Sequence, residues 1–489
     1  MNTRTPIPPA LPEGDVATDG DSTATVISLY QKHRKIYARA VTGTFAAWRW
    51  GLVWATQLLF YGLPWLMWND RQALLFDLTT RRFYVFGLIL YPQDLIYLTA
   101  LLMISAYVLF LFTAVAGRLW CGYACPQTVY TEIFMWFERK LEGDRNQRIK
   151  LDAGPWNGNK ILRKGCKQLV WLAFGLFTGF TFVGYFTPIR SLTESAMTLG
   201  FGPWEWFWVM FYGLATYGNA GFMREQVCKY MCPYARFQSA MFDKDTLIIS
   251  YDAERGEPRG ARSRKADPGK LGLGTCVDCN LCIHVCPTGI DIREGLQYEC
   301  IGCAACIDVC DGVMDKMNYP RGLIRYATQN SLAQHFDRKQ MIARILRPRV
   351  IVYTAILVLI CTAFAVSVAL RDPFRANVVR DRGALARVVE SGMVENVYRL
   401  QLMNNQEQPQ TYRVTVEGLP RIAMESPVEV TVAPAEARWI TLGVRVPFEA
   451  AQQAGPGAHP IHFEIERTAL QGHHEAAKVK EKSTFVVPR

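Results

Sequence analysis

The sequence predicts a multidomain membrane protein with five transmembrane α-helices, an inserted bacterial-type two-cluster ferredoxin domain and a C-terminal all-β sandwich. Three observations predict this fold class. Five apolar stretches have the length of about 20 residues that a helix needs to cross roughly 30 Å of hydrocarbon. Eight of the 14 cysteines form two equally spaced groups in the middle of the chain. Beyond residue 370 there are no cysteines, and short alternating segments replace the long apolar runs.

The composition narrows the class of protein further. The chain has 489 residues, 50% of them hydrophobic, and a net charge of +11, so several modules are expected. Its lysines and arginines gather in loops between apolar segments and form no single stripe with interleaved aromatics. This distribution favours a membrane protein over a nucleic-acid-binding protein. Residues 1–25 are polar and contain no apolar core, so we expect no cleaved secretory signal.

The apolar stretches also define the predicted domains. The helices are expected at 44–68, 93–116, 167–187, 203–222 and 349–370. The first has tryptophans near its ends, where rings that prefer the membrane interface are found. The predicted domains are an N-terminal cytoplasmic segment at 1–43, a four-helix membrane region at 44–222, an inserted region at 223–348 with its ferredoxin domain near 266–318, a fifth helix at 349–370 and an outer domain at 371–489.

The connections between the helices predict the orientation of the chain. Residues 117–166 contain nine Lys or Arg residues, against three in residues 69–92 and one in residues 188–202. Positive residues are retained on the cytoplasmic side, so the N-terminus is predicted inside. We therefore expect a multi-pass protein of the bacterial inner membrane. Its inserted region would lie in the cytoplasm, where thiols stay reduced, and its C-terminal domain in the periplasm.

The C-terminal region alternates between apolar and polar residues with a period of two, and Pro and Gly punctuate it. Alternation with frequent turn residues predicts a small antiparallel β-sandwich. A disordered polar tail is the alternative, and the β-branched and aromatic content argues against it. The predicted strands are 397–402, 412–416, 428–432, 439–446 and 461–465.

Two cysteine runs in the inserted region have the spacing of a two-cluster ferredoxin. Each run reads C-x2-C-x2-C-x3-C, and thirteen residues separate the runs. Three closely spaced thiolates wrap one face of a cubane, and the fourth cysteine of each run ligates the other cluster. Zinc sites, the alternative, seldom show this doubled pattern. We therefore predict one 4Fe-4S cluster on Cys276, Cys279, Cys282 and Cys310, and a second on Cys300, Cys303, Cys306 and Cys286.

Two residues near these runs bear on the ligand assignment. Pro287 follows the first run, whereas Asp311 stands in the corresponding place after the second. This difference is expected to alter the local turn and the cluster potential without changing the number of ligands. His284 lies inside the first run, but thiolates already fill every cluster position. It is therefore predicted to be a partly exposed histidine and not a ligand.

A second constellation consists of two C-x3-C-P motifs. Cysteines four apart lie on one face of a helix, and a following proline disfavours helical geometry at the residue before it. The predicted topology puts both motifs on the cytoplasmic side, where four thiols could form a catalytic soft-metal or redox site that favours Cu(I), zinc or iron. Small residues that pack helix ends are the alternative. The four cysteines are Cys121, Cys125, Cys228 and Cys232, while Cys166 and Cys361 belong to no pattern.

These motifs together resemble the CcoG/FixG/RdxA family of cytochrome oxidase accessory proteins. The resemblance rests on residues 120–129, the 228–233 repeat, residues 245–260 and the ferredoxin runs, and it extends from about residue 30 over nearly the whole chain. It implies an immunoglobulin-like fold for the outer β domain. It also implies a role in maturing cbb-type haem-copper oxidase, through reduction of Cu(II) to Cu(I) on the cytoplasmic side.

The leading hypothesis is a membrane-bound cupric reductase. Electrons would pass from an unknown cytoplasmic donor through the clusters to copper held near the C-x3-C-P cysteines. Two alternatives are a quinol-linked membrane ferredoxin subunit and a non-catalytic copper carrier or assembly scaffold. The expected partners are oxidase assembly factors, copper transporters or chaperones, membrane lipid and a second copy in a homodimer, but not nucleic acid.

Overall fold

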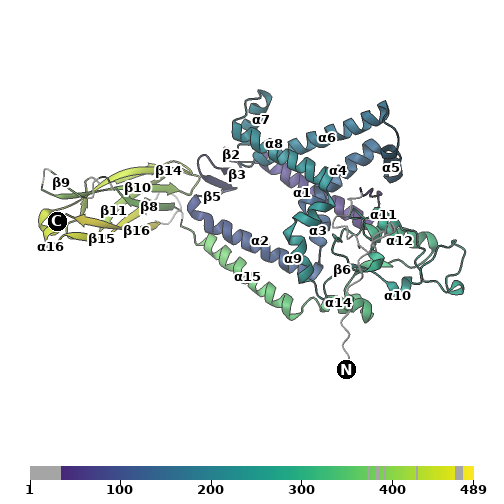
Figure 1. The fold of residues 1–489 in the computed structure, drawn as a ribbon. Helices are drawn as coiled ribbons and strands as arrows, with labels where there is room; N and C mark the ends of the chain where they lie inside the picture. The colour runs from purple at the N-terminus through teal and green to yellow at the C-terminus, as the bar shows by residue number, and fades with distance from the viewer. Residues whose placement is uncertain are drawn as a thin grey trace, which may run out of the picture.

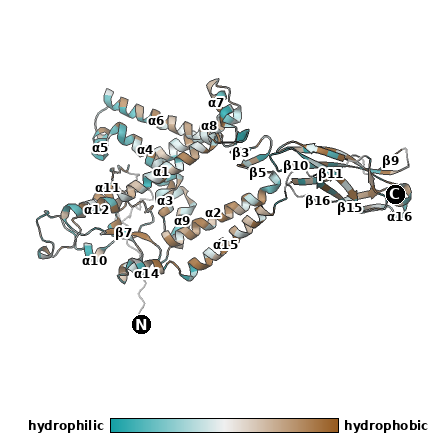
Figure 2. Ribbon diagram, turned by 180° about the vertical axis from the view of Figure 1, so that it is seen from behind, coloured by the Kyte–Doolittle hydropathy of each residue, from teal (hydrophilic) through white to brown (hydrophobic). Residues whose placement is uncertain are grey.

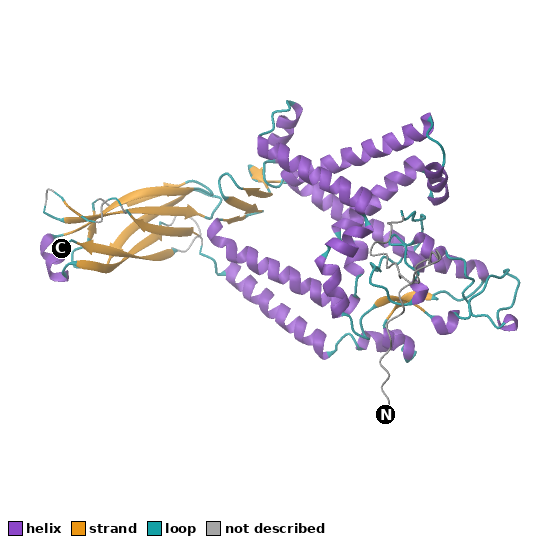
Figure 3. Ribbon diagram, viewed as in Figure 1, coloured by secondary structure: helices purple, strands orange, loops and turns teal. Residues whose placement is uncertain are grey.

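The computed structural model describes residues 35–372, 374–381, 383, 386–389, 392–425, 428–468 and 477–488. The molecule is elongated, with a β domain at one end, the long helices in the middle and the cysteine-rich region at the other end (Figure 1). Strands dominate the first end and helices most of the rest (Figure 3). Most of the predicted N-terminal segment, residues 1–34, lies outside the described residues.

Five helices overlap the predicted membrane spans. They are α1 (Thr44–Gly62), α2 (Leu95–Ala116), α6 (Gly158–Val183), α8 (Pro203–Gly218) and α15 (Pro348–Ala369). Within the described residues, three stretches are long and apolar enough to cross a membrane: Pro92–Ala116, Gly158–Val183 and Pro348–Ala369. Figure 2 shows the apolar colour along α2 and α15. Because α1 and α8 are not among the three, five crossings remain a prediction.

Two of these helices have ends that the sequence pattern did not predict. α6 begins at Gly158 and not near 167, because Asn157 Oδ1 accepts a hydrogen bond from Lys160 N at 2.8 Å and caps a polar first turn. α8 ends at Gly218 and continues as a π-helical turn over Asn219–Met223. Such turns often occur at functional sites.

The long helices pack as two pairs. α6 and α8 approach closely through glycines: a Cβ atom on Gly179 would lie 2.3 Å from Val209 O, and one on Gly175 would lie 2.7 Å from Gly213 O. Small residues allow such backbone contact between membrane helices. The other pair is α2 with α15, which run side by side toward the β domain (Figure 1).

A small antiparallel sheet that the sequence analysis did not predict lies between α1 and α2. Its strands are β3 (Leu74–Asp77), β4 (Arg82–Val85) and β5 (Leu88–Leu90). The sheet packs on the outer domain, where Tyr91 and Met403 share one buried cluster. Tyr91 Oη donates to Asn404 O at 3.1 Å, and Arg71 pairs with Glu407 at 2.7 Å. The outer domain is thereby fixed to the helical region.

The C-terminal domain is a sandwich of two antiparallel sheets. One has the order β12-β14-β10-β8 with β9 on β10, and the other has the order β13-β11-β15-β16. All five predicted strand segments lie within strands. The strands are β8 (Phe374–Arg380), β9 (Arg387–Val388), β10 (Val394–Asn404), β11 (Gln410–Glu417), β12 (Ala423–Met424), β13 (Val428–Val432), β14 (Ala437–Val446), β15 (Gly457–Arg467) and β16 (Lys478–Val487).

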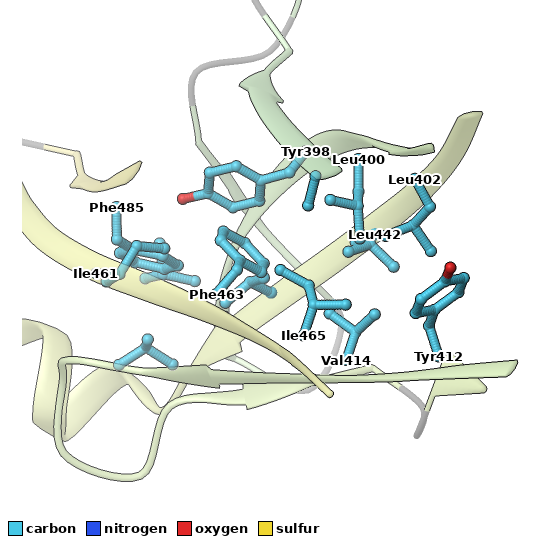
Figure 4. Close-up of a cluster of buried hydrophobic side chains, with 14 of the residues drawn as sticks. Tyr398, Leu400, Leu402, Tyr412, Val414, Leu442, Ile461, Phe463, Ile465 and Phe485 are labelled. Carbon is cyan, nitrogen blue, oxygen red and sulfur yellow. The ribbon is translucent and has the colours of Figure 1, made fainter. Parts of the chain in front are cut away.

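Alternating inward residues from both sheets form the core of this sandwich (Figure 4). Tyr398, Leu400 and Leu402 of β10 are fully buried, and Phe463 and Phe485 face them from the other sheet. Tyr398 and Phe463 meet edge to face, with ring centroids 5.0 Å apart. The alternation seen in the sequence is therefore the inward and outward alternation of a sandwich.

The inserted region is compact around its cysteines. Its main elements are β6 (Ile248–Tyr251), α11 (Leu281–Val285), α12 (Ala305–Met317) and β7 (Ile324–Ala327), with β6 and β7 paired antiparallel. The shorter elements of the chain are β1 (Met67–Trp68), β2 (Arg71–Gln72), α3 (Leu119–Tyr123), α4 (Pro126–Glu142), α5 (Arg145–Ala153), α7 (Ile189–Met197), α9 (Pro233–Met241), α10 (Ala253–Gly256), α13 (Gln329–Ala333), α14 (Arg338–Ala343) and α16 (Phe448–Ala454).

Candidate metal centre

The eight ferredoxin-type cysteines surround two separate cavities. The side chains around the first cavity include Cys276, Cys279, Cys282 and Cys310. Those around the second include Cys286, Cys300, Cys303 and Cys306, with Cys282 also touching it. Each cavity is thus walled by the four thiols that the spacing assigns to one cluster, and the donor set fits iron. Clusters bound there would accept and release single electrons.

The two cysteine loops repeat one backbone conformation. The residues on either side of the middle cysteine have positive φ angles in both loops: 52° at Asp278 and 57° at Asn280, then 71° at Gly302 and 60° at Ala304. Positive φ is uncommon for residues other than glycine. Its recurrence at matching positions shows that both C-x2-C-x2-C segments wrap their cavities in the same way.

The helices that follow the two loops differ because of one residue. Pro287 follows Cys286 and disfavours helical geometry there, so α11 ends at Val285 and Cys286 is extended, with ψ 122°. Asp311 permits α12 to continue through Cys310 to Met317. Asp311 Oδ1 also accepts a hydrogen bond from Gly322 N at 2.9 Å. The sequence predicted a different local turn after the second cysteine run, and the structure shows that the difference is a longer helix.

Burial raises the pKa of five of the cluster thiols, Cys282, Cys300, Cys303, Cys306 and Cys310, and so favours their protonated form when no metal is bound. It raises the pKa of Cys282 to about 11 and the pKa of Cys300 and Cys310 to about 12. The guanidinium groups of Arg293, near Cys282, and Arg118, near Cys300, oppose this rise. Since thiolates are the ligands, cluster binding must release protons from these sites.

The C-x3-C-P cysteines occur where helices break. Cys125 is the extended residue between α3 and α4, with φ −61° and ψ 130°, and Pro126 is the first residue of α4. Cys232 has φ −80° and ψ 109°, and it separates the π-helical turn Val227–Met231 from α9. Both backbones follow from the proline that comes next.

The four thiols lie within electrostatic reach of one another. Burial, together with the neighbouring Cys125, Cys121 and Cys232, raises the pKa of Cys228 to about 12. Among the described residues, however, no three His, Cys, Asp or Glu side chains are spaced to hold a single metal ion.

Gln238 contributes to the C-x3-C-P site but was not identified from the sequence. Its side chain is fully buried on α9, and its Nε2 lies 3.3 Å from Cys121 Sγ. This hydrogen bond lowers the pKa of Cys121, which burial raises to about 11. A glutamine six residues after Cys232 carries no motif, so only the fold could reveal its role.

The C-x3-C-P site touches the second cluster loop directly. A Cβ atom on Gly122 would lie 2.7 Å from Gly302 O and 2.8 Å from Cys303 N, so this contact requires glycine. Arg118 Nη1 donates to Tyr298 O, and its Nη2 donates to Ala235 O at 2.6 Å. These bonds tie α3 to the cluster loop and to α9.

A cavity of about 60 Å³ lies between the two sites. Cys228 and Cys303 both line it, together with polar and sulfur-bearing side chains that include Thr128, Glu132 and Met135. It is the place where a C-x3-C-P thiol and a cluster cysteine face the same space.

α1 is attached to the second cluster loop at its N-terminal end. Asp308 of α12 accepts hydrogen bonds from Phe45 N at 3.1 Å and Ala46 N at 2.7 Å, the position where a helix dipole favours an anion. Arg49 Nη1 donates to Cys303 O at 2.8 Å. This connection between the helical region and the cluster was also not identified from the sequence.

The remaining sequence candidates lie apart from these cavities. His284 is partly exposed and lines neither cluster cavity, and burial lowers its pKa. Cys166 is exposed on α6, and Cys361 is partly buried on α15.

Parts of this chain are similar to known protein families and to a solved structure. Three family models match: a 4Fe-4S dicluster domain over residues 223–329, a 4Fe-4S binding domain over residues 98–143, and an IG-like fold at the C-terminal of FixG over residues 364–488. A crystal structure of a FixG-related protein from Vibrio parahaemolyticus is 23% identical and covers 24% of this chain and 97% of that chain, with a TM-score of 0.21.

Three relatives match most of the chain. Nitrogen fixation protein FixG of Rhizobium meliloti is 39% identical over 447 residues, 85% of each chain. Protein RdxB of Cereibacter sphaeroides is 38% identical over 91% of this chain and 93% of the relative. Protein RdxA of the same organism is 36% identical over 80% and 84%. With its ferredoxin-type motifs, its apolar helices and its C-terminal sandwich, the chain belongs to the FixG, RdxA and RdxB family of membrane iron–sulfur proteins.

Proposed function

We propose that the protein is a cupric reductase that supplies Cu(I) for the assembly of cbb-type cytochrome c oxidase. The observation that carries the proposal is the cavity lined by both Cys303 and Cys228, because it joins a cluster cysteine to a C-x3-C-P thiol. Each Cu(II) that enters would accept one electron and leave as Cu(I). Thiolates stabilise the reduced state of copper.

The residues around the four thiols support this chemistry. Gln238 orients the Cys121 sulfur and favours its thiolate. Gly122 and Arg118 keep the thiol site against the loop of the second cluster. Met135 offers a further soft sulfur in the same cavity. A thiol that binds copper must release its proton to water or to a neighbouring base, and the carboxylate-bearing Glu132 lines the same cavity as Cys228.

The proposal includes a topology. Five spans with the N-terminus inside put the clusters and the four thiols in the cytoplasm of a bacterial cell and the sandwich in the periplasm. The nine Lys and Arg residues between 117 and 166 support this orientation. Copper transporters or chaperones would then deliver copper on the cytoplasmic side, and oxidase assembly factors would receive it. A homodimer in the lipid bilayer is part of the proposal.

Anaerobic copper reduction tests the proposal. The purified protein is reduced, freed of reductant and mixed with Cu(II) and a Cu(I)-specific chelator, while cluster EPR is recorded. We expect the cluster signal to fall in step with Cu(I) formation. Replacing Cys121 or Cys228 with Ser should abolish turnover while iron stays at about eight atoms per chain. The exposed Cys166→Ser variant is the matched control and should behave like the wild type.

The same measurement separates the alternatives. If the reduced clusters lose no electrons when Cu(II) is added, the reductase hypothesis is wrong and a copper carrier or scaffold remains. Loss of iron from Cys121→Ser would show that this thiol serves a cluster. Transfer of electrons between the clusters and a quinone, but not copper, would favour the quinol-linked subunit.

A further inference from the structure

A large apolar cavity lies away from all the cysteines, between α1, α4 and α6. Its volume is about 450 Å³, within the range of pockets that bind small organic molecules. Seven of its twelve lining residues are aromatic, among them Trp50, Trp54 and Phe177. Trp54 and Leu58 on its rim are 62% and 67% exposed, so the mouth opens on an exposed apolar face of α1, which is one of the predicted membrane spans.

This cavity also contains an unsatisfied hydrogen-bond acceptor. The Gln57 amide is within hydrogen-bonding reach of the Tyr130 hydroxyl, yet its buried Oε1 has no hydrogen-bond partner. Leaving a buried acceptor without a hydrogen bond destabilises the protein, and a ligand that donates one would remove that cost. Nearby, the hydroxyls of Tyr61 and Thr178 are 2.7 Å apart. A ligand with a flat apolar ring and an O–H donor would pack against the aromatic walls and donate a hydrogen bond to Gln57 Oε1.

The helix that lines the cavity also contacts the second cluster loop. Trp50 borders the cavity, and the preceding Arg49 donates to Cys303 O at 2.8 Å. With a rise of 1.5 Å per residue, Gln57 lies about 12 Å along the helix axis from Arg49. A redox molecule in the cavity would therefore be held on the same helix that contacts the second cluster loop.

We propose that this cavity binds a lipid-soluble hydroquinone and that the hydroquinone is the electron donor of the protein. The inference rests on the proposed function and identifies the chemical class of its reductant. Oxidation breaks two O–H bonds, turns the hydroquinone into a quinone and releases two protons to water. The two electrons reduce two Cu(II) ions to two Cu(I) ions, so charge and atoms balance.

A phospholipid acyl chain is the competing occupant of such a cavity. An acyl chain fills apolar space but offers no donor to Gln57 Oε1 and gains little from stacked aromatic walls. Tyr61 and Phe177, which both line the cavity, stack on each other with their ring centroids 4.9 Å apart, so aromatic rings already pack face to face at this wall. These features favour the hydroquinone.

Binding is tested with decylubiquinone, a quinone with a ten-carbon tail, by quenching of tryptophan fluorescence in the full-length protein. Gly62 lines the cavity with open space beside it, so Gly62→Phe should fill the cavity and raise the Kd at least about tenfold. Gly51 has equally open space on the same helix but does not line the cavity, so Gly51→Phe should leave the Kd within about twofold. Gln57→Leu should weaken binding without filling the space.

Decanol distinguishes the two occupants, because it has the tail without the ring. It should not displace decylubiquinone. Displacement by decanol at the concentrations at which decylubiquinone itself competes would overturn the inference, and so would equal Kd values for the Gly62→Phe and Gly51→Phe variants.

A reduction experiment separates this inference from the proposed function. If decylubiquinol fails to reduce the clusters while chemically reduced protein still reduces Cu(II), the donor is wrong and the reductase stands. If decylubiquinol reduces the clusters and Cu(II) takes no electrons, the donor site stands and the copper proposal fails.

Discussion

Gly122 is the residue where the C-x3-C-P site and the second cluster loop meet. Any side chain there would strike the backbone of Gly302 and Cys303, which cannot move as the end of a flexible side chain would. A single methyl group is therefore a probe of the contact between the two sites. It changes neither a thiol nor a charge.

Gly122→Ala should slow copper reduction at least about tenfold, because small displacements of reacting groups are costly. Iron content should stay at the wild-type value, since no ligand changes. The measurement is the rate of Cu(I)–chelator formation by reduced protein. Gly165→Ala, at an exposed position of α6 with open space around it, is the control. Equal rates in both variants would show that this contact does not matter for the reaction.

Individual residues also mark what sequence reasoning can reach. The spacing of the cysteines places eight thiols in two groups of four, and the members of each group are among the residues that line one cavity, with Cys282 lining both. The division of the ligands between two clusters stays a prediction. Gln238 and Asp308 could not be found in this way. Their partners, Cys121 and the first turn of α1, are distant in sequence and meet them only in the folded chain.

At the scale of elements, α11 and α12 show that one proline determines where a helix ends. The two helices follow equivalent cysteine loops, but α11 stops before Pro287 and α12 runs on past Asp311. The longer α12 carries both Cys306 and Cys310, which face different cavities. Through these two cysteines α12 links the two predicted clusters, and Cys282 of α11 also lines both cavities.

Asp311→Pro should destabilise the inserted region by about 3 kcal/mol or more, because proline within a helix removes a hydrogen bond and clashes with the preceding turn. Loss of cluster absorbance during denaturant titration measures the change. The neighbouring Gly312→Ala variant is the control; its Cβ meets open space, and alanine should stabilise the helix by roughly 0.5–1 kcal/mol. Unchanged denaturation midpoints in Asp311→Pro would show that α12 need not be continuous.

Hydropathy predicted the ends of some helices well and those of others poorly. The apolar runs of α2 and α15 gave their positions closely, since uninterrupted apolar sequence has few alternatives at that length. The start of α6 was missed because its first turns are polar and carry Lys160, Lys164 and Lys167. These lysines turn inward: Lys164 and Lys167 both pair with the buried Glu142. A pairing between distant helices leaves no periodic signal.

For the whole molecule, the outer sandwich is held to the helical region by a buried charge cluster. Asp94, beside the first turn of α2, pairs with Arg371 at 2.6 Å and with Arg375 at 2.7 Å, and it is almost completely buried. Arg371 follows α15, and Arg375 belongs to β8. One carboxylate therefore joins two long helices to the first strand of the sandwich.

Asp94→Ala should loosen this junction, because removing one partner of a buried pair costs about 3–5 kcal/mol. Trypsin cleaves after arginine, so the variant should release the sandwich faster from detergent-solubilised protein, as gel densitometry would show. Asp315→Ala, which removes an exposed partner of Arg321, is the control and should digest at the wild-type rate. Indistinguishable release from the Asp94→Ala variant and the wild type would contradict this account.

The hydrogen bonds between Asp308 and the first turn of α1 affect how the protein folds during its synthesis on the ribosome. The two ends of this bond are 262 residues apart, so α1 emerges long before its acidic partner exists. Asp308 lies between two cysteines that are expected to hold iron, and its position depends on their loop being closed. Iron supply would thus determine how firmly α1 is held. In chains made under iron starvation, α1 should stay detached from the inserted region.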